Sequence, residues 1–124
     1  MKSKGGFLKG RAKSLVFTLR GTWYLLTTED AAKAQFFLCS VFIVIGFYFG
    51  INRYEWMFQL AAIGAILAVE ALNTAVEKLC DFIHPDYHPK IGFIKDISAG
   101  ASAFMVLVSI VCASIIYYPY LFHD

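Results

Sequence analysis

Four polar residues that could support chemistry recur at helical spacing in the middle of the chain: Glu70, Asn73, Glu77 and Asp81. At about 100° per residue they fall within an arc of roughly 80° and form one polar stripe, about three turns long. Three carboxylates on one helix face repel each other strongly in a low dielectric, so the stripe needs a compensating cation, a protonation event or a phosphate-bearing metal complex. Mg²⁺ fits because it takes carboxylate oxygens and usually shares its coordination shell with nucleotide phosphates. The alternative of solvated carboxylates near a helix end suits Asp81 alone.

The composition of the chain excludes a water-soluble enzyme with its own core. Of 124 residues, 59% are hydrophobic and 16% are charged, whereas ordinary globular domains are roughly a quarter charged. A small domain buries only about 60–70% of its unfolded surface, so this much apolar surface must be covered by lipid. The sequence therefore predicts a single all-α, integral membrane domain over residues 1–124, with room for three transmembrane helices.

Three apolar stretches can supply these helices. The first, 34–51, and the third, 97–122, carry no charge and are long enough to cross about 30 Å of hydrocarbon. The second, 56–69, is too short and must continue through Glu70, which places this carboxyl group inside the bilayer or at its inner boundary. An ionisable residue at that depth is costly and indicates a functional site. We expect transmembrane helices at about 31–51, 55–81 and 93–121.

The N-terminal segment has a different character, because basic residues are interleaved with apolar ones. At helical spacing this pattern is typical of a helix that lies on an anionic membrane surface, so we expect an amphipathic surface helix at about 7–28. The alternative is a solvated basic tail. A cleaved signal peptide is not expected, because the first long apolar stretch begins about thirty residues into the chain. The basic residues are Lys2, Lys4, Lys9, Arg11, Lys13 and Arg20.

Lysine and arginine residues also set the expected orientation. Six precede the first span, and Lys78, Lys90 and Lys95 flank the second connection. The first connection carries only Arg53, and the tail after the third span carries none. The positive-inside rule therefore places the N-terminus and the 82–94 connection in the cytoplasm, and the C-terminus outside.

This topology brings two further charged pairs to the membrane level of the stripe. Glu29 and Asp30 precede the first span, and Lys95 and Asp96 open the third. Together with the stripe, these side chains could bind ATP with Mg²⁺ beside the lipid headgroups. The alternative for Lys95 is a helix-end side chain that extends to the interface, which is common.

The connection between the second and third spans reads HPDYHP over 84–89, and its prolines predict an ordered turn instead of a continuous helix. A zinc site formed by Cys80, Asp81, His84 and His88 is disfavoured, because the spacing matches no common zinc pattern and a second pair of thiolates is lacking. Contact of Tyr87 or His88 with a nucleotide is favoured.

The segment 70–81, EALNTAVEKLCD, resembles the signature of the prokaryotic diacylglycerol kinase family, which also contains undecaprenol kinases. That signature is E-x-hydrophobic-N-S/T-A-hydrophobic-E-x-x-hydrophobic-D, and Cys80 departs from the aliphatic residue usual at its position. The likeness runs from about Phe7 to Phe122. Three further segments match in order and spacing: Tyr87-His88-Pro89, Lys95-Asp96 and Ala99-Gly100-Ala101.

The resemblance implies a multi-pass lipid kinase of the bacterial inner membrane that uses ATP and Mg²⁺ and works as a homotrimer with active sites shared between protomers. It implies that Glu70 is the general base that takes the proton of the lipid hydroxyl, and that Ala99 lies near the lipid. Glu29 and Glu77 would hold the divalent metals that bridge the ATP phosphates. The other residues implied at the nucleotide site are Phe17, Asn73, Asp81, Asp86, Tyr87, His88, Lys95 and Asp96.

Two positions near the N-terminus depart from the pattern of the family. Relatives often have a tyrosine where Phe17 stands, so this ring could stack on a nucleotide but not donate a hydrogen bond. Relatives also often have an arginine near Gly10, a place that Arg11 could fill.

The expected reaction is phosphorylation of diacylglycerol to phosphatidic acid at the inner membrane face. The first alternative is an undecaprenol kinase that makes undecaprenyl phosphate, because either lipid presents a primary hydroxyl at the same depth. A remote alternative is a non-enzymatic scaffold or transporter subunit, which would need polar residues along more than one span. The first and third spans carry only Gln35 and a few serines, too little for an aqueous path. No nucleic-acid partner is expected.

Overall fold

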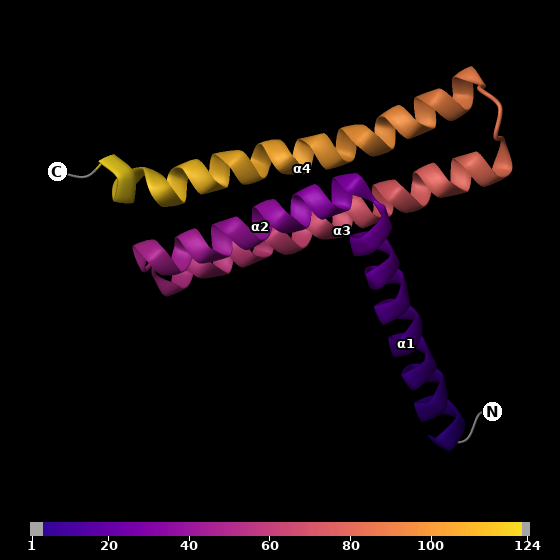
Figure 1. Cartoon of the computed structure of the whole chain (residues 1–124), viewed down its shortest axis with the longest axis horizontal. Helices are drawn as coiled ribbons and strands as arrows, with labels where there is room; N and C mark the ends of the chain where they lie inside the picture. Colours follow the sequence, from indigo (N-terminus) through magenta and orange to yellow (C-terminus); the bar gives the residue numbers. More distant parts are fainter. Residues whose placement is uncertain (1–3, 123–124) are drawn as a thin grey trace.

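The computed structural model describes residues 4–122, which form four helices joined by short connections (Figure 1). The helices are α1 (Lys4–Thr28), α2 (Asp30–Phe49), α3 (Arg53–Ile83) and α4 (Pro89–Phe122). No strand occurs in this part of the chain, so the all-α prediction is confirmed. By length and composition α2, α3 and α4 can each cross a membrane, in agreement with the three expected spans.

The observed helix ends differ by a few residues from the expected ones. α4 begins at Pro89 instead of near residue 93, because proline needs no hydrogen-bond acceptor at the first helical position and its fixed φ suits a helix start. α1 begins at Lys4 instead of residue 7. The prolines of the connection therefore do interrupt the helical path, but the second of them starts the next helix.

A tight turn joins α2 to α3. Gly50 adopts a left-handed conformation with φ of 62°, and its N–H donates to the carbonyl oxygen of Phe47 at 3.2 Å. Asn52 and Glu55 then form a capping box at the start of α3, each side chain accepting from the backbone N–H of the other at 2.9 and 3.0 Å. We call this end of the bundle the turn end, and the opposite end, at residues 84–88, the loop end.

Buried polar side chains connect the three long helices near the turn end. Tyr117 of α4 donates its hydroxyl hydrogen to Gln59 Oε1 of α3 at 2.5 Å, and Gln59 Nε2 donates to the carbonyl oxygen of Phe42 on α2 at 3.1 Å. The Tyr120 hydroxyl donates to Glu55 one turn further along. Because lipid offers no hydrogen-bond partners, such contacts stabilise the bundle.

The three long helices differ in length, and the excess lies at the loop end. At 1.5 Å per residue, the 20 residues of α2 span about 30 Å, the thickness of a hydrocarbon core. The 31 residues of α3 and 34 of α4 span about 46 and 51 Å. Both helices continue past the point where α2 begins, as Figure 1 shows. The second half of the polar stripe lies in this extension of α3.

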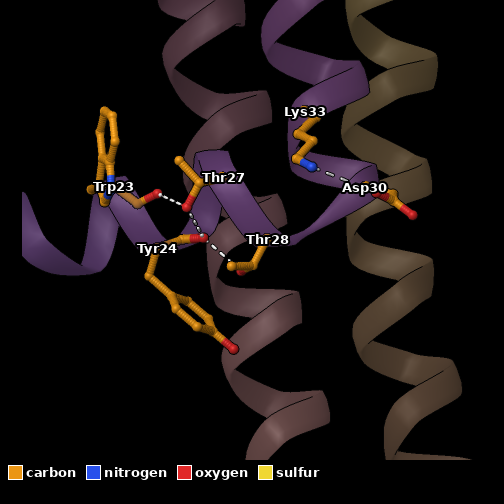
Figure 2. A network of polar contacts seen from close by, with 6 residues as sticks. All are labelled: Trp23, Tyr24, Thr27, Thr28, Asp30 and Lys33. Carbon is orange, nitrogen blue, oxygen red and sulfur yellow. Dashed lines mark hydrogen bonds and ion pairs between the residues drawn. The ribbon is translucent and has the colours of Figure 1, made fainter.

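A single residue, Glu29, connects α1 to α2 and has an extended backbone with φ of −98° and ψ of 115°. Two threonine hydroxyls close the last turn of α1. Thr27 donates to the carbonyl oxygen of Trp23 at 2.7 Å, and Thr28 donates to that of Tyr24 at 2.6 Å (Figure 2). The chain therefore turns sharply, and α1 points away from the bundle (Figure 1).

Most of α1 exposes its side chains, basic and apolar alike. Its large exposed apolar residues suit contact with lipid, and the absence of acidic residues from the helix suits an anionic surface. The placement of α1 on the membrane surface stays a prediction. These apolar residues are Phe7, Leu8, Leu15, Val16, Phe17, Leu19, Trp23 and Tyr24.

Candidate active site

The polar stripe of α3 passes from the buried part of the bundle to its exposed loop end. Glu70 and Asn73 are 6% and 8% exposed, Glu77 is half-buried and Asp81 is exposed. One helix face therefore carries a carboxylate shielded from water and, two and three turns further on, carboxylates within reach of a water-soluble ligand.

Glu70 is held by a side chain from the neighbouring helix. Ser102 of α4 donates its hydroxyl hydrogen to Glu70 Oε2 at 2.7 Å. The hydroxyl of Thr74, although close by, donates to the backbone carbonyl oxygen of Glu70 at 3.0 Å instead of to its carboxylate. Ser102 thus engages one carboxylate oxygen and leaves the other, Oε1, for a different partner.

Asn73 and Glu77 form the middle of the stripe and offer oxygen ligands to a cation. Asn73 Nδ2 donates to Glu77 Oε1 at 3.3 Å, while Asn73 Oδ1 is buried and has no hydrogen-bond partner within the described chain. A buried amide oxygen without a donor, beside a carboxylate, fits Mg²⁺. Because residues 5–122 bring no three His, Cys, Asp or Glu side chains together around a possible metal position, phosphate or water oxygens would complete the coordination shell.

The α1–α2 corner lies against α3 at the same level. Glu29 Oε1 is 2.9 Å from the Nζ atom of Lys78, which follows Glu77 directly in sequence. The same ammonium group lies 5.8 Å from the centroid of the Tyr24 ring on α1. The fold thus brings Glu29, at the start of the first span, to Lys78, the residue that follows Glu77 of the stripe.

The exposed end of the stripe is paired with α4. Lys95 Nζ lies 2.6 Å from Asp81 Oδ1, and both side chains are partly open to solvent. Asp96 and Ala99 are exposed on the same stretch of α4, and Ala99 precedes Ser102 by about one helical turn. Lys95 can therefore exchange its carboxylate partner for a phosphate without the loss of buried surface.

Residues 84–88 form an ordered connection around two histidines. His84 Nδ1 lies 2.6 Å from the carbonyl oxygen of Asp86. His88 Nδ1 accepts from the backbone N–H of Lys90 at 3.1 Å and so caps the start of α4. In neutral His88 this assigns the proton to Nε2, which is left as a donor. Tyr87 is 84% exposed at the tip.

The structure does not bring Phe17 to this group. Its ring is exposed on α1, about 18 Å along the helix axis from Glu29, and the Arg20 guanidinium lies 5.6 Å from the ring centroid. A role of Phe17 at the nucleotide site of its own chain therefore stays a prediction.

The residue types alone indicate no chemistry for two residues of the site. In the sequence Ser102 is one of several serines in an apolar span, and Lys78 is one of the positive charges that set the orientation. For Ser102 a signal existed, since residues equally far from the connection of an antiparallel helix hairpin face each other, and Glu70 and Ser102 are equally far from Asp86.

The comparison with known sequences decides the family. The family model for prokaryotic diacylglycerol kinase matches residues 16–117. The chain belongs to the prokaryotic diacylglycerol kinase family. The resemblance expected from the sequence is thereby confirmed, and the alternative of a non-enzymatic scaffold or transporter subunit is wrong.

Among the relatives of this diacylglycerol kinase family member, some are named undecaprenol kinase and others diacylglycerol kinase. Undecaprenol kinase of Bacillus subtilis (strain 168) is 31% identical over 107 residues, which cover 86% of this chain and 87% of the relative. Diacylglycerol kinase of Haemophilus influenzae is 30% identical over 107 residues, covering 85% and 90%. Diacylglycerol kinase of Escherichia coli (strain K12) is 24% identical over 93 residues, covering 75% and 74%. The family and the three apolar helices together make this chain a multi-pass membrane kinase, a phosphotransferase that acts on a lipid alcohol.

Proposed function

We propose that this kinase transfers the γ-phosphoryl group of ATP to the hydroxyl of a membrane lipid alcohol, with Glu70 as the general base. The observation that carries the proposal is the environment of the Glu70 carboxylate, which is 6% exposed, bonded to Ser102 and aligned with Glu77 on one helix face. A base in this place is shielded from water and within reach of a lipid that enters from the bilayer.

The proposed reaction is an in-line displacement. The lipid hydroxyl gives its proton to Glu70 Oε1 while its oxygen forms a bond to the γ-phosphorus of ATP. The bond from that phosphorus to the β,γ-bridging oxygen breaks, and ADP leaves with the electron pair. Transfer of this kind needs alignment and charge stabilisation more than covalent protein chemistry, which agrees with a site of carboxylates, amides and ammonium groups.

Mg²⁺, when bound, would neutralise negative charge on the ATP phosphates. Glu77 and Glu29 are the proposed ligands, supported by the unpartnered Oδ1 of Asn73 beside Glu77 and by the position of Glu29 at the same level of α3. The chain's own residues would hold the nucleotide at the loop end, where Lys95 and the Nε2–H of His88 can donate to phosphate oxygens. Asp81, Asp86, Tyr87 and Asp96 complete the proposed nucleotide site.

The proposed acceptor is diacylglycerol, with Ala99 near the lipid and phosphatidic acid as the product. Undecaprenol is the second candidate, favoured by the name and the 31% identity of the Bacillus subtilis relative. ATP is available in the cytoplasm, so we place the loop end and the N-terminus on the cytoplasmic side of the bacterial inner membrane, in agreement with the lysines at this end.

We further propose a homotrimer with shared active sites. One feature of the single chain supports it: Phe17, which is expected at the nucleotide site, lies well away from the stripe of its own chain. A neighbouring protomer could bring its own Phe17 to this stripe.

The test is a transfer assay on the purified full chain in detergent micelles with labelled ATP, Mg²⁺ and one lipid alcohol at a time. We expect label in phosphatidic acid when diacylglycerol is offered. The value of kcat/KM for diacylglycerol compared with that for undecaprenol identifies the preferred acceptor. Transfer to neither lipid would contradict the proposed function.

A further inference from the structure

The hydroxyl group of Ser102 is oriented differently from those of seven other helical serines and threonines in the described part of the chain. Such hydroxyls commonly bond to the carbonyl oxygen four residues earlier in their own helix. Ser102 instead crosses from α4 to α3 and donates to Glu70 Oε2 at 2.7 Å. The residues that follow the common pattern are Thr18, Thr22, Thr27, Thr28, Ser40, Thr74 and Ser114.

This contact matters because Glu70 is almost fully buried in a helix bundle surrounded by lipid. An ionised carboxylate in such surroundings is expensive unless donors stabilise it. The Ser102 hydroxyl, 2.7 Å from Glu70 Oε2, can donate a hydrogen bond to a charged acceptor, and such bonds are stronger than those between neutral groups. It also restricts the flexible side chain, since Oε2 is tied to α4 and the direction of Oε1 is therefore set.

We propose that Ser102 is a positioning residue for Glu70, which holds Oε2 of the carboxylate and directs Oε1 toward the hydroxyl of the lipid. The proposal rests on the proposed function of Glu70 as the general base. Ser102 does not need to touch the lipid or the nucleotide, and its effect is exerted through Glu70 alone.

Three variants of the full chain test the role of Ser102. Ser102→Ala removes the hydroxyl, Ser102→Thr keeps it, and Ser109→Ala is the matched control. Ser109 lies seven residues further along α4, on almost the same helix face, and its Oγ is buried without a hydrogen-bond partner within the described chain. Both alanine variants therefore lose a hydroxyl from α4, but only one of them loses a bond to Glu70.

We expect Ser102→Ala to lower kcat roughly 10- to 100-fold, the range for a hydrogen bond to a charged group, and to leave KM for ATP unchanged. Ser102→Thr should restore most of the rate with the same KM for ATP, and Ser109→Ala should behave as the wild type.

Two results would overturn the proposal: a wild-type kcat in Ser102→Ala, or equal losses of kcat in Ser102→Ala and Ser109→Ala, which would indicate a packing effect. Glu70→Gln is measured in the same assay. If Glu70→Gln is inactive while Ser102→Ala is normal, only the positioning role fails. If Glu70→Gln is active, the proposed base fails, and the positioning role fails with it.

Discussion

Lys78 Nζ on α3 lies 2.9 Å from Oε1 of Glu29, the single residue that joins α1 to α2. The same ammonium group lies near the ring of Tyr24, so one side chain holds both the corner and the end of α1 against α3. Glu29 is a proposed metal ligand, and its carboxylate cannot serve Lys78 and a divalent ion equally well. Lys78 therefore competes with the metal for Glu29.

The first prediction follows from this competition. In Lys78→Ala the carboxylate of Glu29 is released, and the Mg²⁺ concentration for half-maximal activity should fall roughly two- to fivefold, the scale of an exposed ion pair. Initial rates over a Mg²⁺ titration measure the change. Lys33→Ala is the control, because Lys33 is paired at 4.0 Å with Asp30, which is no proposed ligand. An unchanged requirement in Lys78→Ala would contradict the competition.

A second prediction concerns the base itself. Glu70→Gln keeps the size of the side chain and an oxygen that can accept from Ser102, but the amide cannot take a proton at neutral pH. We expect kcat to fall about 10²- to 10⁴-fold, the usual contribution of general acid–base catalysis. The Kd for ATP, measured by calorimetry, should stay at the wild-type value. Activity near wild type would show that Glu70 is not the base.

A third prediction addresses the metal ligand in the middle of the stripe. Glu77→Gln removes a charged oxygen ligand, so the Mg²⁺ requirement should rise at least roughly tenfold, as the disruption of metal sites usually does. The matched control is Glu55→Gln at the other end of α3, where glutamine can also serve a capping box. The role of Glu77 as a ligand is refuted if both variants need the same Mg²⁺ concentration.

A fourth prediction separates stability from activity. Tyr117→Phe removes the hydroxyl that donates to Gln59 at the turn end and leaves the buried Gln59 Oε1 without that donor. The free energy of unfolding should fall by about 1 kcal/mol, the scale of hydrogen bonds between membrane helices. Because Gln59 is about 16 Å along α3 from Glu70, kcat should not change. Equilibrium unfolding in mixed micelles and the transfer assay measure the two quantities; a lower kcat at full stability would contradict this separation.

The spans and the buried carboxylate were predictable because lipid leaves few alternatives. Uncharged stretches of about 20 residues have one stable solution in a bilayer, a helix. Glu70 stood out because fourteen uncharged residues precede it, and the spacing to Glu77 placed both on one face. The signature over 70–81 then indicated the family, which the comparison confirmed.

The partners of these residues depend on geometry that residue types do not reveal. Four polar pairs join α3 and α4, separated by 14, 32, 58 and 65 residues in sequence and each centred on the 84–88 connection. Once Pro89 is known to begin α4, this register places Ser102 opposite Glu70. The pairing of Glu29 with Lys78 has no such signal, because it depends on the direction in which one extended residue turns the chain.

Because Glu29 alone joins α1 to α2, the number of residues at this corner is strictly constrained. A residue added to the first turn of α2 would rotate Glu29 by about 100° and shift it by about 1.5 Å relative to the bundle, carrying its carboxylate away from Lys78. A change of length within the five residues between α3 and α4 leaves the stripe of α3 and the pair of Glu29 with Lys78 in place, but it moves the proposed nucleotide contacts of that connection. An insertion next to Glu29 therefore disturbs a proposed metal ligand, whereas an insertion at the loop end disturbs the proposed nucleotide site.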